Sequence, residues 1–507
     1  VKAEAKLVQT IAAASIKYNR WIKDGEMPDV GPTDGPIPDK VDCVVVGAGI
    51  SGITQGSYLA DYGQSVVILD RYHAIGGVWQ FYGNDYSRVN TSEIGYRIVE
   101  KTGAWHRTNE DHSPRLDILR DIHEMGAKHC YGMIRLSTDV VKVEKREDGS
   151  YDVTVRNTKT KAEKTLHAGA VTFHVNRRIG KRREVDWPKS GGFKGNICYG
   201  YGNEVKGLDF WNKRVLIVGA GAFAFENVRT SLEHGARHVT LLGRRDGTTC
   251  PKWIDMIAFL RPRDQFLLMS KGADMVSFAA WQSCYTEAGL HTPKCWEEGL
   301  QKPNNHTISV SDLAFIAGFH DLFGLKVGDI KQVCDDGLGV DLKDGTRIPC
   351  DIIIKCTGFH LNNEVPQVTG YSKMQPYGLL DYNMQYSAEP LLDGGQFAGA
   401  KDKTGIEADK GFEYSDYVKG LEVFKGMGMD QRDIHIYGNP FGSGQGGPVV
   451  FMAKYFAYLV THPEEQKALL KYGGSAPQDV VELWHSQIGE YTNLVLMRLI
   501  ASLSHIA

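Results

Sequence analysis

The chain contains the same pattern twice: an apolar run leads into a glycine turn and then into a helix-forming run. The first copy occupies residues 42–70, with VVVGAGISG at its turn, and the second occupies residues 213–242, with RVLIVGAGAFA. A buried strand, a glycine turn and a helix form the opening unit of a doubly wound α/β domain. The duplication therefore predicts an α/β protein with two nested Rossmann-like dinucleotide-binding domains.

The length of 507 residues exceeds what one hydrophobic core usually serves, which agrees with more than one domain. We expect the first domain to occupy residues 40–185 and 349–460, with the second domain, residues 186–348, inserted between its two parts. A polar helix with a Pro/Gly-rich linker is expected over residues 1–39, and a helical segment over residues 461–507.

Composition limits the class of protein. Hydrophobic residues make up 42% of the chain, charged residues 23%, and the formal net charge is −3. These values are ordinary for a soluble enzyme and give no electrostatic basis for a nucleic-acid partner. The nine cysteines are scattered without a CxxC pair, which predicts reduced thiols and a cytoplasmic location. The histidines lack metal-ligand spacing, so no metal site is expected.

No apolar stretch is long enough to cross a bilayer, so we expect no transmembrane segment. The longest candidate, residues 494–506, carries Arg498 and His505. Its pattern predicts an amphipathic helix that packs on the body of the protein or on a partner subunit. A homo-oligomer is therefore left open.

The first glycine turn has the GxGxxG spacing. Gly47 allows the tight turn, Gly49 lets the backbone approach a pyrophosphate, and Gly52 lets the helix pack closely on the strand. The free N–H groups at the helix start favour an anion. Asp70 ends the second strand, where a carboxylate accepts hydrogen bonds from an adenosine ribose. This segment is therefore predicted to bind a dinucleotide.

The second turn has Gly219 and Gly221 but Ala224 at the third position, a variant that the fingerprint tolerates. Its second strand ends in Arg244 and Arg245 instead of a carboxylate. A guanidinium group suits the 2′-phosphate of an adenosine ribose bidentately. The second site is therefore predicted to prefer NADPH over NADH.

Three further motifs resemble one family. They are Gly76-Gly77-Val78-Trp79, Asn90-Thr91-Ser92 and Cys356-Thr357-Gly358-Phe359. Together with the two glycine turns they resemble, in order and spacing over most of residues 40–460, the class B flavoprotein monooxygenases, which include flavin-containing monooxygenases, N-hydroxylases and Baeyer–Villiger monooxygenases. The resemblance implies FAD at the first site and NADPH at the second. It also implies a C4a-(hydro)peroxyflavin that uses O2 to oxygenate a small-molecule substrate, with nitrogen or sulfur as the expected atom.

The resemblance also implies residue roles. Asn90 is expected beside the flavin and NADP as a catalytic residue, and Arg88 is a candidate for stabilising the peroxide. The family fingerprint FxGxxxHxxx(Y/F/W) has its counterpart at residues 193–203, where Tyr199 replaces the histidine and Asn203 replaces the terminal aromatic residue. Tyr199 is therefore included as catalytic, because its hydroxyl both donates and accepts. The remaining expected cofactor-binding residues are Arg71, Gly77, Trp79, Asn90, Val140, Thr357, Gly358 and Gln445.

Two segments complete the expected flavin site. The run 351–359, DIIIKCTGF, is predicted to be a buried parallel strand that returns the chain to the first domain. The glycine-rich stretch 437–448, which contains Gln445, precedes an apolar helix over residues 449–459. In related flavoproteins such a helix points its N-terminus at the pyrimidine end of the flavin and stabilises negative charge there. A plain helix-capping loop is the alternative interpretation.

Other functions on the same fold remain open. An NADPH oxidase needs the same two cofactors. A disulfide reductase needs a redox cysteine pair, and neither glycine-turn segment contains one. A flavin-dependent halogenase is less favoured because the WxWxIP segment is absent. A non-catalytic dinucleotide-binding protein would retain both domains, since a fold alone does not settle function.

Overall fold

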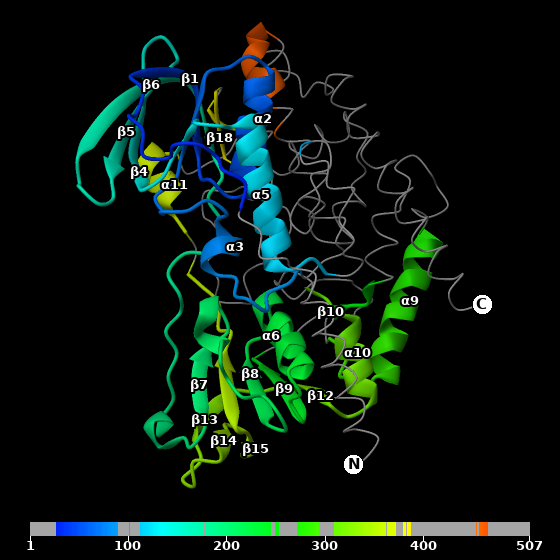
Figure 1. The fold of residues 1–507 in the computed structure, drawn as a ribbon. Coiled ribbons are helices and arrows are strands. Elements are labelled where there is room, and N and C mark those ends of the chain that lie inside the picture. The colour runs from blue at the N-terminus through cyan, green and yellow to red at the C-terminus, as the bar shows by residue number, and fades with distance from the viewer. Residues whose placement is uncertain are drawn as a thin grey trace.

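The computed structural model describes residues 27–89, 101, 112–176, 179–244, 249–252, 271–293, 309–360, 362–371, 379–381, 383–386, 453 and 456–464. Two sheets dominate these residues, and Figure 1 shows them in two lobes with the short helix α3 (Val78–Phe81) between them. The first lobe carries the first glycine turn and the second lobe carries the second. The predicted α/β class with two nested Rossmann-like units is confirmed.

The first lobe is built on an eight-stranded sheet with a parallel core. Helix α2 (Ile50–Asp61) packs on β1 and β2, and α5 (Arg115–His129) packs on α2. The parallel strands are, in spatial order, β18 (Met384–Tyr386), β6 (Glu163–Phe173), β1 (Lys40–Val46), β2 (Val66–Leu69) and β3 (Ile134–Arg135).

Antiparallel strands extend this sheet. β17 (Leu379–Asp381) pairs with β18, and β4 (Thr138–Lys145) and β5 (Tyr151–Asn157) form the predicted hairpin that continues into β6. Helix α11 (Glu364–Thr369) lies against β4. The chain thus returns to the first lobe after residue 358, far along the sequence from β1, as a domain with an inserted second domain requires.

The second lobe is a five-stranded parallel sheet. Its helices are α6 (Ala222–Glu233), which packs on β8 and β9, and α10 (Asp312–Phe319), which packs on α6 and β12. The strands are, in spatial order, β12 (Phe323–Val327), β9 (His238–Gly243), β8 (Arg214–Val218), β16 (Ile352–Lys355) and β7 (Asn196–Tyr199).

Smaller elements complete the second lobe. A three-stranded antiparallel sheet packs on the face of the large sheet opposite α6. The elements are β13 (Ile330–Val333), β14 (Gly339–Leu342), β15 (Arg347–Pro349), the bridge strands β10 (Thr249–Cys250) and β11 (Ser309–Val310), the helix α9 (Lys271–Glu287) and the 3₁₀ turns η3 (Ser190–Gly192) and η4 (Gly202–Val205).

The central strands of the second sheet are buried on both faces, which explains their continuous apolar runs. In β8, Val215 and Ile217 belong to the core shared with α6, whereas the intervening Leu216 belongs to the core shared with β13 and β14. In β16, Ile352 belongs to the core shared with α6, and Ile353 belongs to the core shared with β13 and β14. Both layers are needed to bury this sheet.

One predicted domain boundary is wrong by a few residues. The run 351–359 was expected to belong to the first domain from residue 349 on, but β16 pairs in parallel with β8 and β7 in the middle of the second sheet. The second lobe therefore extends to residue 355. The strand is held there by a contact between distant residues: Asp351 at the start of β16 forms a bidentate ion pair with Arg214 at the start of β8, with Oδ1 at 2.8 Å and Oδ2 at 3.1 Å.

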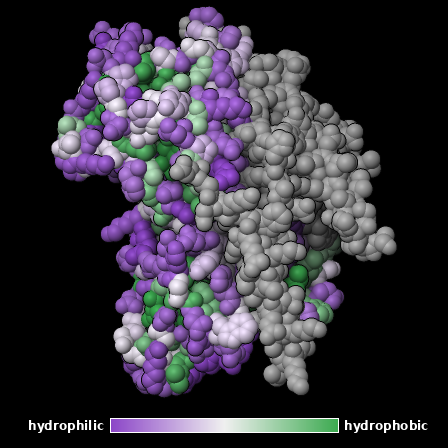
Figure 2. Space-filling view, viewed as in Figure 1, coloured by the Kyte–Doolittle hydropathy of each residue, from purple (hydrophilic) through white to green (hydrophobic). Residues whose placement is uncertain are grey.

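The terminal helices predicted over residues 6–23 and 494–506 lie outside the described residues, as does the glycine-rich stretch 437–448. Of the helix predicted over residues 449–459, Ala453 and residues 456–461 are described and helical, and Phe456 is buried in the core of the first lobe. Among the described residues no helix is both long and apolar enough to cross a membrane. Figure 2 shows a mostly hydrophilic surface over both lobes.

Candidate dinucleotide sites and their junction

The first glycine turn is packed against backbone atoms at two of its glycines. Gly47 has φ +107°, and its N–H donates to the carbonyl of Leu69 at 2.7 Å. A Cβ on Gly47 would lie 2.6 Å from the carbonyl oxygen of His174, and a Cβ on Gly52 would lie 1.8 Å from the carbonyl oxygen of Gly47. Neither position accepts a side chain, so both glycines are required by the geometry of the turn.

Gly49 is different, because the protein leaves room for a Cβ atom at this position. A Cβ there would meet only the backbone of Gly77, at 3.6 Å from its Cα. Gly77 begins α3 with φ +55°, and the N–H of Gly76 donates to the carbonyl of Ala48 at 2.9 Å. The GGVW turn therefore lies directly on the glycine turn. Gly49 and Gly77 thus face each other at the position where a pyrophosphate is expected.

The start of α2 is chemically open. Its N-cap is Gly49, no side chain caps the helix, and the first turn holds no acidic residue. The contrasting case is α10, where the Ser311 hydroxyl accepts from the N–H of Ala314 and Asp312 occupies the first turn. Unsatisfied N–H groups at an uncapped helix start attract anions. This end of α2 fits a pyrophosphate.

Asp70 is positioned by the turn itself. Its Oδ2 accepts from the N–H of Ala48 at 2.7 Å, and its Oδ1 accepts from the N–H of Tyr72 at 2.9 Å. Burial raises the pKa of Asp70, while these two backbone hydrogen bonds act in the opposite direction. Each carboxylate oxygen keeps a lone pair for a ribose hydroxyl.

The second glycine turn repeats the first with one change. Gly219 has φ +126°, and its Cβ would lie 2.1 Å from the carbonyl oxygen of Cys356. Gly221 caps α6 without a side-chain hydrogen bond, and no acidic residue lies in the first turn. Ala224 stands at the third position and is fully buried. This helix start is also open to an anion.

The strand that follows ends differently from its counterpart. β9 ends at Gly243, and Arg244 comes next with an exposed side chain. Arg245 lies outside the described residues. An exposed guanidinium beside an open helix start fits the predicted contact with a 2′-phosphate.

An aromatic cluster links the second turn to the end of α3, and the sequence did not predict it. Tyr201 packs on Phe223 of the second glycine turn at 5.2 Å between ring centroids and on Phe359 at 4.7 Å, and Phe359 contacts Tyr82 beyond α3 at 5.3 Å. The Tyr201 hydroxyl accepts from the N–H of Gly358 at 3.1 Å. The only sequence signal was an aromatic residue two positions after Tyr199.

Tyr199 lies on β7 beside this cluster, with its ring between two cations. Arg182 is 3.7 Å and Lys355 4.2 Å from the ring centroid. Its hydroxyl donates to Glu184 at 2.9 Å and accepts from the N–H of Val185 at 3.2 Å. Both capacities of the hydroxyl are used by residues 184 and 185 in the linker between β6 and β7. This geometry favours a positioning role over direct contact with a cofactor.

Arg88 is buried and lies 3.7 Å from Glu233 at the end of α6, so its charge faces the second lobe. Arg71 lies in an ion-pair group with Asp139 at 3.1 Å and Glu364 at 2.6 Å. Both arginines therefore have protein partners at the positions where ligand contacts were expected.

The other predicted cofactor residues lie near the two turns. Trp79 is half-buried in α3, Val140 is buried in β4, the Thr357 hydroxyl donates to the carbonyl of Arg183 at 3.2 Å, and Gly358 has φ +81° with open space around it. Asn90 and Gln445 lie outside the described residues. Their roles stay predictions.

One buried acid was missed. Glu226 lies in α6, is buried, and has its pKa raised by burial to about 7. The signal was a lone carboxylate inside the apolar run AFAFENV. A charged residue at such a position needs a partner in the fold.

Two open helix starts on two parallel sheets, with a shared aromatic junction, define a two-dinucleotide-binding α/β protein. Comparison with known proteins agrees. A model of the NAD(P)-binding Rossmann-like domain matches residues 45–121. EthA from Mycobacterium tuberculosis, described as an FAD-containing monooxygenase, is 23% identical over 360 residues, which cover 64% of this chain and 70% of that protein.

A 4-hydroxybenzoate brominase from Pseudoalteromonas luteoviolacea is 23% identical over 342 residues, 63% of this chain and 62% of that protein. Among solved structures, OTEMO in complex with FAD and NADP matches with a TM-score of 0.54 at 14% identity, covering 84% of this chain and 85% of that one. The predicted resemblance to flavoprotein monooxygenases is confirmed by the sequence relatives, and the predicted fold is confirmed by the structure.

Proposed function

We propose that this chain is an NADPH-dependent flavoprotein monooxygenase that holds FAD at the first glycine turn and NADPH at the second. The observation that carries the proposal is the pairing of two uncapped helix starts, at Gly49 and Gly221, across one junction. Each helix start offers free N–H groups to a pyrophosphate, and no acidic residue in either first turn opposes it.

The chain's own residues bind and orient the cofactors. The start of α2, with Gly77 opposite it, takes the FAD pyrophosphate, and Asp70 accepts from the adenosine ribose. The start of α6 takes the NADPH pyrophosphate, and Arg244 with Arg245 binds the 2′-phosphate. Bound flavin, once reduced by NADPH, supplies the activation of O2 and the oxygen transfer.

The junction keeps water away from the place where the cofactors meet. Tyr201, Phe223 and Phe359 form an aromatic cluster at the second turn, and Phe359 contacts Tyr82 at the end of α3. Tyr199 holds the linker through Glu184, and its ring is fixed between two cations. Excluding water favours transfer of oxygen to the substrate over release of hydrogen peroxide. The substrate is a small molecule, with a nitrogen or sulfur atom as the oxygenated centre.

A halogenase or an NADPH oxidase is the second candidate. The brominase relative favours a halogenase, since it is as similar in sequence to this chain as EthA is. Both alternatives use the same two cofactor sites and differ in the fate of the activated oxygen. A cytoplasmic location and a homo-oligomer remain predictions.

The test measures whether the electrons of NADPH end in an oxygenated product or in hydrogen peroxide. We expect the purified protein to carry FAD, to oxidise NADPH, and to place oxygen from ¹⁸O2 into one of a panel of amines, sulfides and ketones. Asn90→Leu should leave FAD binding nearly intact and divert NADPH to hydrogen peroxide, because a donor between flavin and NADP is lost.

The ratio of hydrogen peroxide to NADPH consumed, in wild type and variant, is the measurement. A wild type that turns all its NADPH into peroxide with every compound, unchanged by the substitution, would establish the oxidase. Bromination of 4-hydroxybenzoate in the presence of bromide would establish the halogenase instead.

A further inference from the structure

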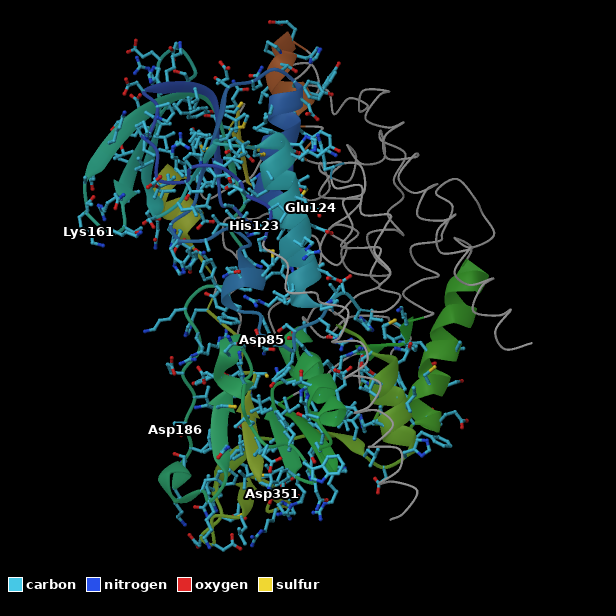
Figure 3. All side chains as sticks on the ribbon, in the orientation of Figure 1. Asp85, His123, Glu124, Lys161, Asp186 and Asp351 are labelled. Atoms are coloured by element: carbon cyan, nitrogen blue, oxygen red, sulfur yellow. The ribbon has the colours of Figure 1, made fainter. Side chains whose placement is uncertain are left out.

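A short segment between the two lobes, residues 84–89, is here called the strap. Asn84, Ser87, Arg88 and Val89 in it are each at most 4% exposed. Figure 3 labels Asp85 at the level where the two lobes meet. Its carboxylate lies 2.6 Å from Lys206 of the second lobe and 3.7 Å from Arg115 of the first.

The backbone of the strap is tied to the first lobe. The N–H of Val89 donates to the carbonyl of Ser113 at 2.9 Å, and the N–H of Arg115 donates to the carbonyl of Ser87 at 2.9 Å. The ring nitrogen Nδ1 of His112 lies 2.7 Å from the carbonyl oxygen of Val89. These contacts attach the strap to the start of α5.

The side chains of the strap are tied to the second lobe. Three consecutive residues contact one helix, α6. The ring of Tyr86 packs on His234 at 4.3 Å between centroids, Ser87 hydrogen-bonds the carboxyl group of Glu226, and Arg88 lies 3.7 Å from Glu233. The strap therefore contacts α6 and its C-cap residue His234, and it joins this helix to α5.

Glu226 is the least expected of these partners. Burying a carboxyl group inside the fold costs free energy unless a specific contact compensates. The corresponding position of α2, five residues after the N-cap glycine, is Thr54, whose hydroxyl donates within its own helix to Ile50. The carboxyl group in α6 instead reaches across to the strap.

We propose that Glu226 is a positioning residue: it fixes the strap on the helix that starts at the second glycine turn, so that a dinucleotide bound at Gly221 restricts the strap. The strap ends immediately before Asn90. The identity of the dinucleotide and the role of Asn90 rest on the proposed function, but the docking of the strap on α6 does not.

The groups that face Glu226 define how this docking responds to pH. They are Arg229 on its own helix, Ser87 on the strap, and Cys356 after β16. Arg88 and Glu233 form the neighbouring pair. Burial raises the pKa of Glu226 to about 7, although the hydrogen bond with Ser87 and the charge of Arg229 act in the opposite direction, so the buried position favours the protonated acid. Docking should therefore weaken as the pH rises through 7.

Hydrogen exchange of peptide 84–89 in the full-length holoenzyme tests the proposal. We expect NADP⁺ to slow this exchange in wild type. Glu226→Leu and Ser87→Ala should each speed it by roughly tenfold and abolish the response to NADP⁺, because a buried partner is removed. Ser87→Ala leaves α6 untouched but also removes the hydrogen bond that its hydroxyl accepts from the N–H of Asn84 at 2.8 Å, so its loss of the response to NADP⁺, rather than faster exchange alone, decides the matter if Glu226→Leu does not fold. The exposed Glu287→Gln is the control and should match wild type.

Glu226→Gln separates positioning from simple packing. The amide keeps the size and the hydrogen bond, so protection of the strap should persist, but its wild-type decrease between pH 6 and 8 should disappear. Strap exchange equal to wild type in both Glu226→Leu and Ser87→Ala would overturn the inference. A protein that lacks FAD and ignores NADP⁺, yet loses strap protection in Glu226→Leu, would refute the proposed function and uphold the docking.

Discussion

The two glycine turns share a backbone design and differ at their third position. In the first turn a Cβ on Gly52 would overlap the carbonyl oxygen of Gly47, whereas the second turn holds Ala224 with its methyl group fully buried. The first helix is therefore packed more tightly on its strand than the second. The same fingerprint thus tolerates alanine in one copy and excludes it in the other.

The two sites also differ in charge where the second strand ends. Asp70 is buried and held by two backbone N–H groups, while Arg244 is exposed. A buried carboxylate suits a ribose hydroxyl, and an exposed guanidinium suits a phosphate that arrives from solvent. The two strand ends therefore present opposite charges in different surroundings, one buried and one exposed.

Replacing Gly49 by valine should have the largest effect, complete loss of FAD from the purified protein. The backbone at Gly49 has φ −81° and a Cβ meets only Gly77, so the variant should fold. The side chain would occupy the space that the pyrophosphate needs. The measurement is the flavin absorbance per protein, with Gly191→Ala as the matched control. Full FAD occupancy in a folded variant would refute the first site.

The third position gives the next largest effect, and it tests the comparison directly. Gly52→Ala should destabilise the fold by more than ~3 kcal/mol, since its Cβ collides with backbone. Ala224→Gly should cost only about 1–2 kcal/mol, for a lost methyl group and a glycine inside a helix. Urea unfolding followed by circular dichroism measures both. Equal costs would show that the two turns are equally packed.

Removing Arg244 and Arg245 together should weaken NADPH more than NADH. Each lost charge-assisted contact costs about 1.5–3 kcal/mol. The measurement is the ratio of kcat/KM for the two coenzymes, and the control is the double variant of two exposed lysines of the first lobe, Lys40→Ala with Lys159→Ala. A ratio that stays at the wild-type value would mean that these arginines do not contact the 2′-phosphate.

The last comparison concerns the buried faces of α2 and α6, which carry Thr54 and Glu226 at corresponding positions. The pKa of Glu226 is raised above its value of 4.5 in an unfolded chain to about 7, so its contribution is complete below 4.5 and lost as the pH rises through 7. Relative to Glu226→Gln, wild type should lose up to ~3 kcal/mol of unfolding free energy between pH 4.5 and 8.

Unfolding free energies of wild type and Glu226→Gln at several pH values check this. Thr54→Ser, which keeps the neutral hydroxyl on α2, serves as the control and should show no change in its difference from wild type across the same range. A Glu226→Gln difference that is constant with pH would show that the acid is ionised throughout, as in an exposed site.

The sequence predicted the parts of the fold that follow from local pattern. The two glycine turns, the strands that precede them, the hairpin of β4 and β5, and Asp70 at the end of β2 all occur where the residues indicated. Each depends on neighbours within about 30 residues, so period and turn chemistry suffice to predict them. The central place of β16 in the second sheet was not predicted, because pairing partners are chosen by distant strands.

The candidate site, like the fold, has features that the sequence predicts and features that only the tertiary structure shows. The sequence by itself determined that the chain has two dinucleotide-binding openings, because a glycine is readable wherever a backbone must turn or approach a ligand. Only the tertiary structure shows which residues lie between the two openings. The Tyr201 cluster and the docking of the strap on Glu226 join residues more than 130 positions apart, and no periodicity along the chain encodes such a contact. Such a contact forms when the two sheets come together and bury the polar and aromatic side chains that lie between them.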